Sequence, residues 1–212
     1  KGAASSLCGS GAMNGVINIR TGWATDKPKS TLTLYEGVYS NPRREVTRWW
    51  KKFSNPFMAG LFFSHRQKFD NLHVVIGANV HALKSYIQNG DDQQARLNLK
   101  TKIDSKKIKG LSYGINFNAM GQQFGRVFLW TNATDSAYIP RPGTQSNDYY
   151  SFLTIDPHFT YLKENGTKHT LRTRYYNVVR WADRKVKEGS TNSYYFNYQY
   201  QNRPNASRWR RA

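Results

Sequence analysis

This sequence has few acidic residues, a single cysteine and no long apolar run. Asp and Glu number 13 against 32 Lys and Arg, which gives a formal net charge of +19. One cysteine, Cys8, excludes an internal disulfide and any cysteine-rich metal site. No apolar stretch approaches the roughly 18 residues of a membrane-spanning helix. Enzymes that cleave sugars use paired carboxylates, which are scarce here, and Asp156 is the best candidate for such a role.

Aromatic residues are abundant. The chain holds 14 Tyr, 11 Phe and 6 Trp, or 15% of its residues, although its mean hydropathy is −0.75. A chain that is polar on average and rich in aromatics is typical of a membrane β-barrel, with a polar lumen and aromatic girdles at both interfaces. The positive charge alone would favour nucleic acid or an anionic surface. It is spread over loops and single strand faces, however, so no nucleic-acid partner is expected.

Apolar and polar residues alternate with a period of two along much of the chain. The stretch from Leu72 to Lys84 is the clearest case, with six apolar positions on one side and mostly polar positions on the other. Such a stretch spans ~20 Å or more at ~3.4 Å per residue, close to the height of a membrane-facing apolar band. The predicted strands are 31–39, 57–68, 72–84, 93–103, 111–120, 149–162, 167–180 and 191–201.

The connections between these strands alternate in length. The longer ones are 41–56, 85–92, 121–148 and 181–189, and the shorter ones are 69–71, 104–110 and 163–166. Outer-membrane barrels have short periplasmic turns and long outside loops. The sequence therefore predicts an all-β, antiparallel sheet of about eight strands from a transmembrane β-barrel.

No catalytic constellation, metal site or cofactor site is predicted. The histidines lack metal-ligand spacing with carboxylates or a thiol, so they are interpreted as polar residues of the lumen. Candidate ligand contacts lie in the first long connection, where cations and indoles occur together. They are Arg43, Arg44, Trp49 and Trp50. An interfacial aromatic belt with cations facing lipopolysaccharide is the favoured alternative for the same residues.

The opening stretch joins a segment of small residues to a short β-branched run. It carries Lys1-Gly2-Ala3-Ala4-Ser5-Ser6-Leu7-Cys8-Gly9-Ser10-Gly11-Ala12-Met13-Asn14-Gly15-Val16-Ile17-Asn18-Ile19. A dinucleotide-binding loop is disfavoured, because the last glycine gap is one residue too long and a strand follows where a helix is needed.

The same stretch closely resembles the C-terminal end of the plug domain of TonB-dependent outer-membrane receptors. The matching residues are Gly2, Ser5, Leu7, Gly9, Ala12, Gly15, Val16, Ile17, Asn18 and Ile19. Ala3 and Cys8 depart from the family pattern, where Pro and an aromatic are usual. The following residues look most like the large nutrient and siderophore receptors of Bacteroidetes-type bacteria.

The resemblance implies a division into a plug end at 1–22, the first part of a 22-stranded barrel at 23–202 and an irregular basic tail at 203–212. Gly9, Gly11, Gly15 and Asn18 would shape the exit of the plug. An internal fragment of a bacterial outer-membrane receptor is expected, taking up siderophore-iron, cobalamin or a glycan. Its implied partners are outer-membrane lipid and lipopolysaccharide, a TonB-type energy-coupling complex, the small nutrient and a surface lipoprotein.

One alternative architecture and one alternative function stay open. A closed eight-stranded barrel is one architectural alternative, although many cations would crowd its narrow interior. The functional alternative is a soluble basic β protein that binds nucleic acid through stacked aromatic side chains and cations. An enzyme is not expected.

Overall fold

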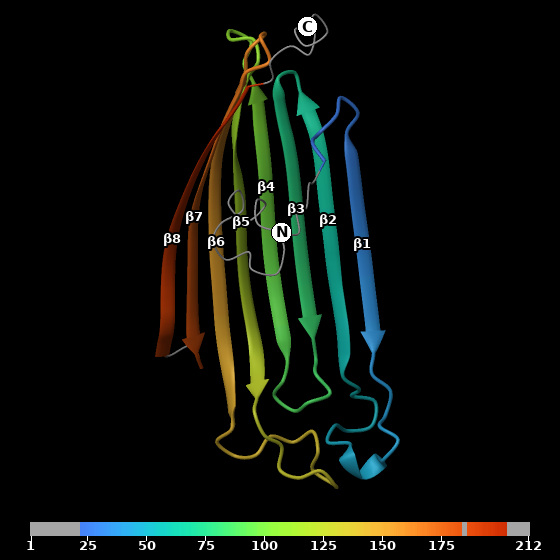
Figure 1. The fold of residues 1–212 in the computed structure, drawn as a ribbon. Coiled ribbons are helices and arrows are strands. Elements are labelled where there is room, and N and C mark those ends of the chain that lie inside the picture. The colour runs from blue at the N-terminus through green and yellow to red at the C-terminus, as the bar shows by residue number, and fades with distance from the viewer. Residues whose placement is uncertain (1–21, 184–185, 203–212) are drawn as a thin grey trace, which may run out of the picture.

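The computed structural model describes residues 22–183 and 186–202, and it shows one antiparallel sheet (Figure 1). Its strands are β1 (Lys29–Val38), β2 (Phe57–Phe69), β3 (Leu72–Leu83), β4 (Asp92–Asp104), β5 (Leu111–Val127), β6 (Gln145–Leu162), β7 (Lys168–Ala182) and β8 (Val186–Gln201). Each strand pairs with the next along the chain. The prediction of an all-β fold with eight antiparallel strands is confirmed, and a short 3-10 helix, η1 (Glu45–Thr47), lies between β1 and β2.

The strand register gathers apolar side chains on one face of the sheet. Ala78 of β3 lies opposite Leu97 of β4, which lies opposite Ala119 of β5. Because side chains alternate between faces, the neighbours Gly77, Asn98 and Asn118 fall together on the other side. We call these the apolar face and the polar face.

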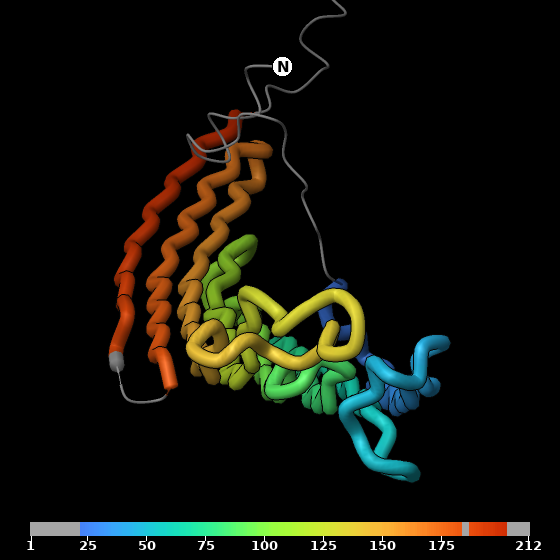
Figure 2. The backbone as a smooth tube through the Cα atoms, turned by 90° about the horizontal axis from the view of Figure 1, so that it is seen from below, coloured from blue at the N-terminus to red at the C-terminus, as the bar shows by residue number. Residues whose placement is uncertain are grey.

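The sheet is curved, and its polar face is on the inside of the curve. Figure 2 shows β6 to β8 bending away from the plane of β1 to β4, with residues 22–28 on the inner side. In this segment Trp23 contacts His73 of β3 and His158 of β6, both of which belong to the polar face. The polar face is therefore concave and the apolar face convex.

The apolar face is not covered by another layer in the described chain. Ala24 and Trp50 are the buried hydrophobic side chains among the described residues, and both lie outside the strands. Leu34 of β1 is 70% exposed, and Leu97 in the middle of the sheet is 49% exposed. Tyr194 of β8 reaches 81%. The sheet thus carries a broad apolar surface that no described segment packs against.

Three long connections lie together at one end of the sheet, the lower end in Figure 1, and the short turns lie at the other. The long connections are 39–56, 84–91 and 128–144, and the turns are 70–71, 105–110 and 163–167. The prediction of a fourth long connection at 181–189 is wrong. β7 and β8 continue almost to their junction, because Arg180 pairs with Gly189 in the ladder and its guanidinium lies 3.1 Å from the Glu188 carboxylate.

The sheet is open. In the described residues β1 pairs with β2 alone and β8 with β7 alone, so the two edge strands do not meet. The closed eight-stranded barrel is therefore excluded as the arrangement of these strands. None of the described helical residues forms a segment long and apolar enough to cross a membrane.

Candidate functional site at the loop end and the concave face

An aromatic cluster joins the three long connections. The ring of Tyr86 lies 5.4 Å from that of Tyr39 and 5.4 Å from that of Tyr138, measured between centroids. Trp130 continues the row, 6.3 Å from Tyr138. The Trp49 indole N–H donates to the Tyr86 carbonyl oxygen at 2.7 Å. Contacts between rings thus hold connections that are far apart in the sequence as one unit at this end of the sheet.

The four residues of the first connection that were predicted to contact a ligand fall into two groups, the indoles and the arginines. Trp50 is 7% exposed, and its indole N–H donates to Asn41 Oδ1 at 3.3 Å. Trp49 packs edge-on against it, with ring centroids 5.8 Å apart. These two indoles shape the connection itself, whereas Arg43 and Arg44 are exposed. The structure therefore leaves the two cations available to a ligand and places the two indoles in the packing of the loop.

The third long connection is ordered by one asparagine side chain. Asn132 Oδ1 accepts hydrogen bonds from the backbone N–H groups of Thr134, Asp135 and Ser136 at 2.9 to 3.1 Å. The Asn132 side chain also lowers the pKa of the exposed Asp135 carboxyl, through a hydrogen bond that favours the charged form. This local scaffold holds the tip of the connection that carries Trp130 and Tyr138.

Nearly every strand cation lies on the concave face. By the strand register these are Lys29, Arg66, Lys68, Arg96, Lys100, Lys102, Arg126, Lys168, Arg172, Arg174 and Arg180. The exception among the described strand residues is Lys187, which pairs with Trp181 on the apolar face. Acidic strand residues on the concave face are fewer. They are Asp92, Asp104, Asp148, Asp156 and Glu188. The interior of the curve is accordingly basic.

Asp148 is the centre of an ion cluster near the loop end. Its side chain is fully buried, and the Arg180 guanidinium lies 2.7 Å from its carboxylate. Arg126 bonds the same oxygen from β5. Glu188 of β8 lies 3.1 Å from the Arg180 guanidinium, so strands β5 to β8 are tied across the concave face. The buried carboxylate is compensated by two guanidinium groups, which is the condition for tolerating such a charge.

Asp156, further along the concave face, is also bound by an arginine. The Arg174 guanidinium binds both its oxygens, at 2.8 and 2.7 Å. Such a bidentate pair fixes the carboxylate in place. The acid considered for sugar cleavage thus has an arginine partner on the neighbouring strand.

Trp23 anchors the segment 22–28 to the concave face. The Lys100 ammonium lies 3.6 Å from the centroid of the Trp23 ring. The next residue, Ala24, is buried, and its carbonyl oxygen lies 3.1 Å from the His73 ring. The other His73 nitrogen lies 2.9 Å from Asp104. The sequence does not reveal this contact, since nothing local marks a tryptophan as the partner of a lysine on a distant strand.

Two groups predicted from the sequence lie outside the described residues. They are the expected plug exit, formed by Gly9, Gly11, Gly15 and Asn18, and the basic tail at 203–212. Among the described residues no group of three or more His, Cys, Asp or Glu side chains is placed to hold a metal ion. In comparisons with known proteins, no family model, no curated protein and no solved structure matches this chain.

Proposed function

We propose that this chain is part of a TonB-dependent outer-membrane receptor that takes up a scarce nutrient. Residues 23–202 would be the first strands of its barrel, and the stretch before them the end of its plug. The proposal combines the resemblance of the opening stretch with the shape and polarity of the sheet. The nutrient class would be siderophore-iron, cobalamin or a glycan, as in the family that the opening resembles.

The observation that carries the proposal is the uncovered apolar face backed by a basic, polar concave face. Contiguous apolar surface of this extent is rare on a soluble protein and indicates a missing apolar neighbour. Lipid is such a neighbour, and a water-filled lumen suits the other face. Along β3 the apolar positions run from Leu72 to Ala82. At ~3.4 Å per residue and a tilt of 35–45° this spans roughly 24–28 Å, close to the ~25 Å band of outer-membrane barrels.

Two further features support the same assignment. The rings of Tyr149 and Trp181 lie 5.2 Å apart on the apolar face at its loop end, where an interfacial aromatic girdle is expected. Trp23 and Ala24 are held on the concave side, where a chain leaving a plug inside the barrel would run. The open edges β1 and β8 would pair with further strands, because lipid does not tolerate unpaired strand edges.

The lipid assignment is tested on two neighbouring residues of β4. In the full-length protein with Cys8→Ala and no other native cysteine, where β1 and β8 have their proposed neighbours, spin labels at Leu97→Cys and Asn98→Cys are compared in bilayers. Leu97 belongs to the apolar face and Asn98 to the polar face. The label at 97 should collide mainly with oxygen, which concentrates in lipid, and the label at 98 mainly with a water-soluble nickel chelate. Equal nickel access at both positions would contradict a lipid-facing sheet.

The uptake assignment needs a separate experiment in the source organism. A strain lacking the gene should lose growth when one nutrient class, namely iron chelate, cobalamin or glycan, is limiting. Growth should return when that nutrient is abundant, since high concentrations bypass active uptake. A strain that grows normally under limitation of all three would count against the proposed role.

The nucleic-acid alternative keeps one favourable observation, the gathering of cations on the concave face. Phosphate-backbone binding weakens steeply as salt is raised, because counterions are released on binding. Salt-dependent binding of single-stranded DNA by the refolded chain in detergent-free buffer would support that alternative. Absence of such binding, together with insertion into bilayers, would favour the receptor.

A further inference from the structure

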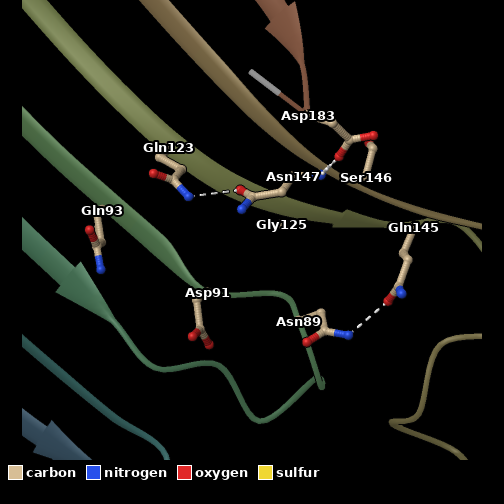
Figure 3. A pocket seen from close by; sticks show the side chains of 9 residues that line it. All are labelled: Asn89, Asp91, Gln93, Gln123, Gly125, Gln145, Ser146, Asn147 and Asp183. Carbon is tan, nitrogen blue, oxygen red and sulfur yellow. Dashed lines mark hydrogen bonds between the residues drawn. The ribbon is translucent and has the colours of Figure 1, made fainter. Parts of the chain in front are cut away.

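A polar hollow of ≈ 540 Å³ lies on the outer, convex face of the sheet at its loop end (Figure 3). The residues that line it are Asn89, Asp91, Gln93, Gln123, Gly125, Gln145, Ser146, Asn147 and Asp183. Its volume falls within the range of ~300–1,000 Å³ that is usual for small-molecule sites. The proposed receptor function does not involve this hollow.

The strand register explains why the hollow forms. Gln93, Gln123, Tyr149 and Trp181 make one cross-strand row on the apolar face. One step closer to the loops lies Gly125 of β5, which pairs with Asn147 and has no side chain, so the backbone of the 84–91 connection can lie directly against it. A Cβ on Gly125 would clash with the Asn89 carbonyl oxygen, so the 84–91 connection packs on this glycine and forms one wall of the hollow.

The lining offers amides, and each side-chain amide has two N–H donors and an oxygen with two lone pairs. The Asn89 amide donates to Gln145 at 2.9 Å, and the Gln123 amide donates to Asn147 at 3.1 Å (Figure 3). These bonds orient the amide groups along the rim of the hollow. The Gln93 side chain is exposed there as well, on the strand next to Gln123.

Charged ligands fit the hollow poorly. None of the described lining residues is Lys or Arg, the groups that bind phosphate or carboxylate. A metal ion would need free carboxylates, but Asp91 already accepts from the Lys84 ammonium at 2.6 Å and the Ser85 N–H at 3.0 Å. Asp183 accepts from the Asn147 N–H at 2.8 Å. Among ligand classes, a neutral molecule with many hydroxyl groups therefore fits this lining best.

We infer that this hollow is a saccharide-binding site, which recognises sugar hydroxyls through the amides of Gln93, Gln123 and Asn147. Two sources present this hydroxyl chemistry, a free oligosaccharide and the headgroup of a glycolipid. The second source rests on the proposed membrane function, because the hollow lies directly beside the Tyr149–Trp181 pair, at the expected border between lipid and water.

The test compares one double variant with a matched control. Gln93→Leu combined with Asn147→Leu removes two amides from the hollow while leaving the backbone ladder and Gly125 intact. Gln94→Leu removes an amide from the same strand, but that side chain belongs to the concave face and donates to Asn79. If these substitutions act through folding, saccharide binding should fall in the double variant and in Gln94→Leu. If they act through the site, binding should fall in the double variant alone.

The free-sugar arm measures binding of maltopentaose to the full chain in detergent by equilibrium dialysis, and it does not depend on membrane insertion. The glycolipid arm reconstitutes the chain into phosphatidylcholine nanodiscs with and without digalactosyl diacylglycerol, and quantifies the glycolipid retained on the purified protein. Binding in either arm that falls about ten-fold in the double variant and persists in Gln94→Leu supports the site and identifies its source.

Other outcomes overturn the inference. Absence of saccharide binding in both arms would do so, as would binding that the double variant and the control reduce equally. Binding of inorganic phosphate in place of maltopentaose, lost in the same double variant, would show an anion site instead. Equal nickel access of the labels at 97 and 98, together with intact maltopentaose binding, would reject the proposed receptor and keep the saccharide site.

Discussion

At the scale of single residues, a few side chains on the concave face have partners that set their roles. The fully buried Asp148 lies between two arginines of neighbouring strands, and Trp23 lies against Lys100. Each contact joins segments that are far apart in the sequence. Substitutions at these positions therefore report on the assembled sheet rather than on one strand.

Replacement of Asp148 should be the most damaging single change on the concave face. Asp148→Asn removes the buried carboxylate between the guanidinium groups of Arg126 and Arg180, which keep only Glu188, at 3.9 and 3.1 Å. We expect a loss of roughly 3 kcal/mol of unfolding free energy, the lower end for breaking a buried pair, because both arginines keep partial contact with water. Urea unfolding in detergent, followed by tryptophan fluorescence, measures it. Asp26→Asn is the control, since that carboxylate is 88% exposed in its pair with Lys68. Equal effects at both positions would contradict the prediction.

Trp23 should hold the segment 22–28 through its ring. Trp23→Leu removes the cation–π contact with Lys100 and should lower the unfolding free energy by about 1 kcal/mol. Trp23→Phe keeps an aromatic face and should lose less. An endoproteinase that cleaves on the N-terminal side of aspartate should also cut the Leu variant faster before Asp26, which lies in this segment. Identical proteolysis of the Leu and Phe variants would show that the lysine contact does not hold the segment.

At the scale of the elements, most strands are longer than the alternation alone predicts. The alternation predicts that β5 ends at Met120, but the strand runs to Val127 in spite of two glycines, because each pairs in the ladder with a residue of β6. β7 and β8 likewise extend through residues predicted to form a charged loop, stabilised by the cross-strand pair of Arg180 and Glu188. Tertiary pairing thus overrides weak local strand propensity.

Gly125 should be essential for seating the 84–91 connection on β5. In Gly125→Ala the new methyl group meets the Asn89 carbonyl oxygen and the backbone must move. We expect a loss of about 1–3 kcal/mol, as for overpacked positions, and faster tryptic cleavage at Lys84. Gly77→Ala is the matched control, because its Cβ would meet its nearest neighbour at an ordinary 3.7 Å. A Gly125→Ala chain as stable as Gly77→Ala would show that the connection adapts freely.

At the scale of the whole molecule, one uncovered apolar face and two open edges decide how the chain behaves in solution. Phe196 on the edge strand β8 is 70% exposed, and Leu34 on the opposite edge strand β1 is exposed to the same extent. Exposed apolar area and unpaired strand edges both promote association. We therefore expect self-association in plain buffer and dispersal with retained β structure in detergent micelles, measured by sedimentation velocity and circular dichroism. A monodisperse, folded monomer in detergent-free buffer would contradict this.

The sequence by itself determined the strands, the two faces of the sheet and the end at which the first three long connections lie. This information is local, because a period of two sorts side chains to opposite faces whatever the partners are. Only the tertiary structure decided the open edges, the burial of Trp50, the cluster around Asp148, the place of Trp23 on the concave face and the hollow that Gly125 lines. Each of these depends on which residues of different strands lie opposite one another, and that register is set by pairing across the sheet rather than by any single stretch of the chain.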